Sequence, residues 1–146
     1  MNIIILHNLI SCIKLQIMKS IERVVLLWVL TIIGMILHFN YHIGGIFYGM
    51  DITVEGSNGL ITNSTHVIRG LFYHLPIVYI LLIMYLKGKI FNWIMLGVSI
   101  VYIIAHVSHL FGEMKSDHAD ISQISLLTLV LIIGLLINKE HFNKAR

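Results

Sequence analysis

Cysteine and charge are both scarce in this chain of 146 residues, and each scarcity narrows the class of protein. A single cysteine, Cys12, excludes an internal disulfide and a metal cage built from thiolates. Only 12% of the residues are charged, which is about half the share in a soluble domain. With 58% hydrophobic residues and a mean hydropathy of +0.89, the composition indicates an integral membrane protein.

The net charge of +3 and the isoelectric point near 9.1 would suggest an anionic partner if the basic residues formed a patch. They are instead dispersed over the chain ends and the short connections between apolar runs. Membrane topology explains this distribution, so we expect no nucleic-acid partner.

Uncharged apolar runs predict four membrane crossings, at about residues 24–47, 67–86, 90–111 and 121–137. Each run is close to the ~20 residues that cross a bilayer at a rise of about 1.5 Å per residue. The connections after the second and third runs are short, which favours antiparallel neighbours, and the first connection is a longer polar loop. The sequence therefore predicts an all-α integral membrane protein, with residues 21–146 forming a four-transmembrane-helix up-down bundle.

Residues 1–20 form a separate segment whose apolar part is too short for a crossing. The segment also lacks the charged start and the small-residue cleavage site of a signal peptide. Two interpretations stay open: an interfacial helix on the membrane surface, or an extension upstream of a natural start at Met18.

Basic residues predict the orientation of the bundle. Eight of the ten lysines and arginines lie on the side that holds both chain ends and the connection at 87–89, whereas Arg69 and Lys115 lie on the other. The positive-inside rule then places both termini in the cytoplasm. We expect the membrane to be the bacterial inner (plasma) membrane.

Histidines are concentrated near the outer ends of the predicted spans. They recur at spacings of three and four residues, so each helix carries one polar stripe, and polar residues in membrane helices face the bundle interior. An isolated histidine near a membrane boundary is more often an interfacial residue, but seven of nine on converging stripes predict a cluster near the outer face. The seven are His38, His42, His66, His74, His106, His109 and His118.

The favoured ligand of this cluster is b-type haem used in electron transfer, with the chain as a subunit of a larger redox complex. His38, His74 and His106 lie deepest and can supply axial imidazoles from facing helices. Arg69 can pair with the haem propionates. The small residues that would let the macrocycle pack are Gly34 and Gly70.

A non-haem Zn, Cu or Fe ion is the first alternative, in a metal-dependent membrane enzyme or a metal carrier. His109 and Glu113 are four residues apart and can chelate one ion. The candidate ligands are His38, His42, His74, His106, His109, Glu113 and His118.

A proton- or cation-conducting module without a cofactor is the second alternative, because ionisable residues inside a membrane mark such paths. Such a module would work with transport partner subunits, as the haem protein would work with redox partners. The sequence does not decide whether the protein has catalytic activity.

Overall fold

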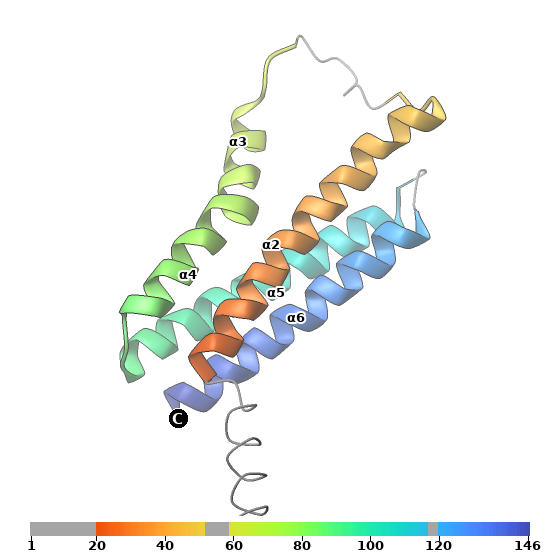
Figure 1. Cartoon of the computed structure of the whole chain (residues 1–146). Helices are drawn as coiled ribbons and strands as arrows, with labels where there is room; N and C mark the ends of the chain where they lie inside the picture. Colours follow the sequence, from red (N-terminus) through yellow and green to blue (C-terminus); the bar gives the residue numbers. More distant parts are fainter. Residues whose placement is uncertain (1–19, 52–58, 117–119) are drawn as a thin grey trace, which may run out of the picture.

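The structure is a computed structural model that describes residues 20–51, 59–116 and 120–146, all helical apart from turns and short connections (Figure 1). Most of the segment 1–20, with its two open interpretations, lies outside the described residues. The first crossing is α2 (Ser20–Gly44), extended by the 3-10 turn η1 (Gly45–Tyr48). The second is divided into α3 (Asn63–Arg69), η2 (Gly70–His74) and α4 (Leu75–Tyr85). The third and fourth are α5 (Lys89–Met114) and α6 (Ile121–Ala145).

Four helical stretches are long and apolar enough to cross a membrane, at Ile21–Tyr48, Asn63–Tyr85, Lys89–Met114 and Ile121–Ala145. Each overlaps one of the four predicted crossings, so the all-helical membrane fold is confirmed. Helix α6 continues past the predicted crossing because Ile137, His141 and Ala145 recur every four residues on its buried face.

Side-chain caps define where two of the helices begin. The Thr62 hydroxyl accepts a hydrogen bond of 3.3 Å from the backbone N–H of Thr65 at the start of α3. The Asp120 carboxylate accepts one of 2.8 Å from the N–H of Ser122 at the start of α6. Both caps satisfy an N–H that the first helical turn leaves without a backbone partner.

Helix α6 packs against both α2 and α5, and α4 packs against α2 (Figure 1). We call the end where α2 begins and α6 ends the terminal end, and the opposite end the histidine end. Three aromatic rings pack together toward the terminal end. The ring centroid of Trp28 lies 5.4 Å from that of Tyr79 and 5.1 Å from that of Tyr102. An ion pair of 3.2 Å between Arg23 and Glu140 joins α2 to α6 at the same end.

The helices spread apart at the histidine end, where α3, the part of the second crossing that precedes η2, diverges from α2 (Figure 1). A smaller core of Met35, Phe72, Leu127 and Val130 holds α2, η2 and α6 together below this opening. The two ends of one bundle therefore differ in packing, and polar side chains of α2 and α5 meet at the looser end.

The second crossing changes helix type at η2, a π-helical turn in which the Leu75 N–H donates to the carbonyl of Gly70. In the same register the Leu71 carbonyl would pair with residue 76, which is proline and has no N–H. The hydroxyl of Tyr102 on α5 donates to the Leu71 carbonyl instead. A side chain from a neighbouring helix thus satisfies the backbone group that the proline leaves open.

We expect Tyr102→Phe to destabilise the bundle by about 0.5–1.5 kcal/mol, the usual value of a hydrogen bond between membrane helices. The measurement is reversible unfolding in mixed detergent micelles, followed by circular dichroism. Because the Leu71 carbonyl needs Tyr102 only when residue 76 lacks an N–H, the loss should be smaller in a Pro76→Ala background. An equal loss in both backgrounds would show that Tyr102 acts through ring packing alone.

Candidate metal centre

His38 is the centre of a group of four side chains at the histidine end. It lies on α2 and is 3% exposed. Its Nε2 atom lies 3.1 Å from Nε2 of His42 and 2.9 Å from Nε2 of His109. The Glu113 Oε1 atom lies 3.7 Å from His38 Nε2 and 3.2 Å from His42 Nε2. We call these four residues the metal group.

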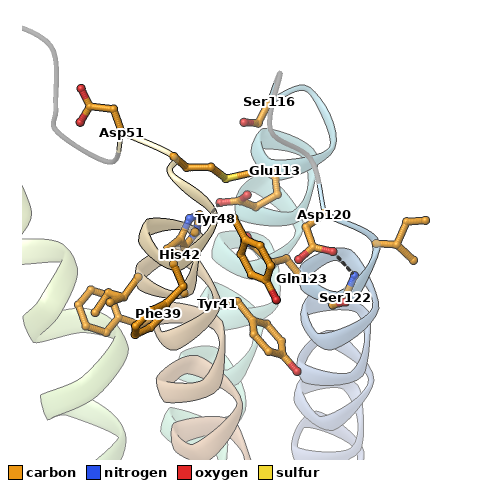
Figure 2. Close-up of a pocket in the computed structure, with 16 residues that line it drawn as sticks. Phe39, Tyr41, His42, Tyr48, Asp51, Glu113, Ser116, Asp120, Ser122 and Gln123 are labelled. Atoms are coloured by element: carbon orange, nitrogen blue, oxygen red, sulfur yellow. Dashed lines mark hydrogen bonds and ion pairs between the residues drawn. The ribbon is translucent and has the colours of Figure 1, made fainter.

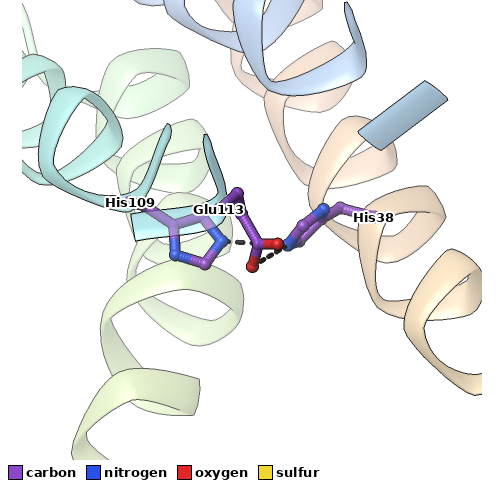
Figure 3. A group of neighbouring side chains, drawn as sticks. All are labelled: His38, His109 and Glu113. Carbon is purple, nitrogen blue, oxygen red and sulfur yellow. Dashed lines mark hydrogen bonds and ion pairs between the residues drawn. The ribbon is translucent and has the colours of Figure 1, made fainter. Parts of the chain in front are cut away.

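Helical spacing explains why the group forms. His38 and His42 are four residues apart on α2, and His109 and Glu113 are four apart on α5, so each helix presents one pair on one face. The ligand atoms of His38, His109 and Glu113 all lie within 4.8 Å of one another (Figure 3). In this view the His38 and His109 rings lie on either side of the Glu113 carboxylate, with His38 on α2 and the other two residues on α5.

The separations match the first shell of a single ion. Bonds of about 2.0–2.2 Å in a tetrahedral arrangement place neighbouring ligand atoms about 3.3 Å apart. Four of the six separations between donor atoms in the metal group range from 2.9 to 3.7 Å. Two or three imidazoles with one carboxylate are a donor set that suits Zn, Cu or Fe.

Hydrogen bonding among these residues does not satisfy them all. A neutral imidazole nitrogen carries either one hydrogen or one lone pair, so His38 Nε2 forms a good bond to His42 or to His109 but not to both. The other ring nitrogen of His38, Nδ1, is buried and has no hydrogen-bond partner in the part of the chain that the structure describes. A cation bound among these nitrogens would be coordinated by the lone pairs that take part in no hydrogen bond.

Backbone electrostatics favours positive charge at the same place. The metal group lies near the C-terminal ends of both α2 and α5, whose last carbonyls form the negative ends of the helix dipoles. Each such end stabilises a nearby cation by roughly 0.3–1 kcal/mol. The group is also mostly shielded: the side chains of His38 and Glu113 are 4% and 14% exposed, and that of His42 is 46% exposed.

Other predicted ligands lie outside the metal group. His74 and Arg69 are exposed, and neither belongs to the set of close ligand atoms. The π turn gives the physical reason, because one extra residue in a turn rotates the rest of the helix by roughly 100°. His118 lies outside the described residues.

His106 is buried at 2% exposure, and both of its ring nitrogens lack a hydrogen-bond partner among the described residues. It lies one turn from His109 on α5, on the side toward the terminal end. Its nearest described ring is Phe72, with 5.2 Å between centroids. His106 therefore lies next to the metal group inside the bundle and does not belong to the close set of donors.

Phe72 is the residue of this region that the sequence interpretation missed. It occupies the bundle-facing position of η2 that the stripe pattern predicts for His74, and it also lies 6.1 Å from His109. The sequence does carry one signal: Gly70 and Pro76 flank this turn, and a proline there favours an irregular helix with a shifted face.

No family model matches the chain, and no curated protein or solved structure matches it either. The class of protein that its helices define is an integral membrane protein with four membrane-length helices. Within that class, the described residues include one group, His38, His109 and Glu113, that could hold a metal ion. Function must therefore be argued from this site alone.

Proposed function

We propose that the protein binds one transition-metal ion of the Zn, Cu or Fe class in the metal group. His38, His109 and Glu113 supply three ligands, and His42 supplies or guards the fourth position. The observation that carries the proposal is the position of His38 Nε2, which has three further donor atoms from two helices between 2.9 and 3.7 Å away.

Two features support an ion over haem. Axial ligands of a haem stand on opposite faces of a wide macrocycle, whereas the donors of the metal group are in mutual contact. Gly34, the small residue expected to make room on α2, instead has Val130 of α6 beside it, only 2.5 Å from where a Cβ would lie. Haem b with electron transfer stays a prediction with less support than the ion.

The ligand set favours a metal-dependent membrane enzyme over a purely structural ion. Structural zinc sites are closed by four protein ligands, whereas catalytic sites keep one exchangeable position. His42 is the most exposed member of the metal group, so its place is the one that water or a substrate atom can take. An ion held in this way polarises a bound oxygen or activates a bound water.

The proposal includes an orientation. Arg23, Lys87, Lys89, Lys139 and Lys144 all belong to the terminal end, which supports a cytoplasmic terminal end under the positive-inside rule. The metal group would then face the outer side of a bacterial inner membrane. Partner subunits, whether redox or transport, would contact the lipid-facing helix surfaces.

Metal loading tests the proposal. Protein purified in detergent and stripped with chelator should bind about one Zn ion per chain, measured by elemental analysis and competitive titration. Glu113→Gln should weaken binding by at least about tenfold, since it removes the carboxylate charge from the metal group. The matched control is Glu22→Gln, the same chemical change at the terminal end. Protein that binds no Zn, Cu or Fe ion, or that is purified with a Soret band of haem, would contradict the proposal.

A further inference from the structure

The metal group forms one wall of a cavity of about 490 Å³ between α2, η2 with α3, and α5. All four members of the group line it. Away from them the lining is mainly apolar, with Met35, Phe39, Ile68, Phe72 and Ala105. The cavity is therefore most polar where the ion would lie.

The cavity opens along the membrane-spanning part of the bundle. Phe39 and Ile68, on its two sides, are 47% and 54% exposed and belong to helices of membrane length. The helices that carry them diverge toward the histidine end (Figure 1). In a bilayer such apolar residues face acyl chains, so the opening faces lipid.

A second and larger cavity, of about 1370 Å³, lies on the other side of the metal group (Figure 2). Its lining combines apolar and aromatic side chains such as Phe47 and Tyr48 with the polar residues Asp51, Ser116, Asp120 and Gln123, so water and cations can also enter it. Phe39, His42 and Glu113 line both cavities. The metal group thus stands between a larger vestibule that also carries polar residues and a smaller, mainly apolar cavity that faces lipid.

We propose that the apolar cavity binds the hydrocarbon tail of a membrane amphiphile whose oxygen-bearing head reaches the ion. The inference rests on the proposed function and names the substrate class of the same site. The volume of the apolar cavity, about 490 Å³, is within the range of roughly 300–1,000 Å³ that is typical of small-molecule sites. A tail buries apolar area against Phe39, Ile68 and Phe72, and a carboxylate or ester oxygen takes the exchangeable position of the metal.

A wholly water-soluble ligand fits this arrangement less well. It would enter through the vestibule and leave the apolar cavity unfilled, so it would gain nothing from the apolar lining. A pure hydrocarbon would fill the cavity and leave the metal group without a partner. An amphiphile is the one class that uses both.

The test is photo-crosslinking in phosphatidylcholine nanodiscs with a palmitic acid analogue that carries a diazirine in its chain. The zinc-loaded wild type should be labelled on α2, η2 and α5 around the cavity, and unlabelled palmitic acid should suppress the signal. Ser108→Phe places a ring at an exposed rim position of the cavity, and we expect about tenfold less labelling. Ser125→Phe, an exposed position on α6 outside the cavity lining, is the matched control and should label as wild type.

The outcomes separate this inference from the proposed metal site. Zinc binding is measured on the same samples, and Ser108→Phe should retain it. Labelling spread evenly over all lipid-facing helices, or equal in Ser108→Phe and Ser125→Phe, overturns the amphiphile site while zinc binding stands. Cavity labelling that is the same after zinc removal overturns the contact between head and ion. Failure to bind any ion removes the premise, and with it the inference.

Discussion

Replacing His38 with alanine is expected to abolish stoichiometric metal binding, the largest single effect in the metal group. His38 Nε2 contacts all three other donors, so its loss removes the atom around which both helices converge. Loss of an outer partner of a metal ligand costs about 10–100-fold in affinity, and loss of the central ligand should exceed that. The measurement is zinc affinity by competition with a chromophoric chelator.

His74→Ala is the matched control, because His74 is an equal candidate in the sequence but is exposed on η2. It should bind zinc with wild-type affinity. Helix content and thermal unfolding of the metal-free His38→Ala protein should stay close to wild type, which separates ligand loss from misfolding. Equal losses in His38→Ala and His74→Ala would mean that the ion binds elsewhere.

Gly34→Ala is expected to be the most damaging small substitution in the bundle. A Cβ at residue 34 would lie 2.5 Å from Cγ2 of Val130, which is 1% exposed and stiff at χ1. Helices α2 and α6 must then separate, at a cost of about 1–3 kcal/mol in unfolding free energy. Because His38 lies one turn further along α2, zinc affinity should fall as well. Unfolding in mixed micelles and zinc titration measure the two effects.

Two further variants identify the cause. Val130→Ala added to Gly34→Ala removes the clashing methyl groups and should recover most of the zinc affinity. Gly97→Ala on α5 would place its Cβ with no described neighbour within 4 Å and should be neutral or slightly stabilising. If the double variant binds zinc no better than Gly34→Ala, the close contact between α2 and α6 does not determine where His38 lies.

Much of the fold can be predicted from the sequence because membrane solvation gives a strong rule. Backbone groups inside a bilayer must be paired within the chain, so apolar runs of sufficient length become helices. The pairs His38 with His42 and His109 with Glu113 follow from the same regularity, since a spacing of four fixes a shared face. The local geometry of each pair could therefore be predicted without knowing how the helices pack.

Irregular turns and contacts between helices determine the features that the sequence does not predict. The π turn at Gly70–His74 rotates His74 away and brings Phe72 toward His106. Predicted depth in the membrane makes His106 and His38 equal candidates as ligands. In the structure His38 contacts donor atoms of the other helix, and His106 does not belong to the close set of donors. Helix α6 continues to Ala145 because its last turns are buried against neighbouring helices. The charged residues after Ile137 hide this from a sequence-based prediction, since they suggest that the helix ends there.

Helices α2 and α5 carry the two halves of the metal group, but α2 packs closely against α4 and α6 and reaches α5 through side chains. An ion bound by residues of both helices would link α2 to α5 at the histidine end, and the link would be lost when the ion dissociates. Free metal at about a hundred times the dissociation constant would add about 2.7 kcal/mol to stability. The local supply of metal would then set how strongly α2 and α5 are held together at the histidine end.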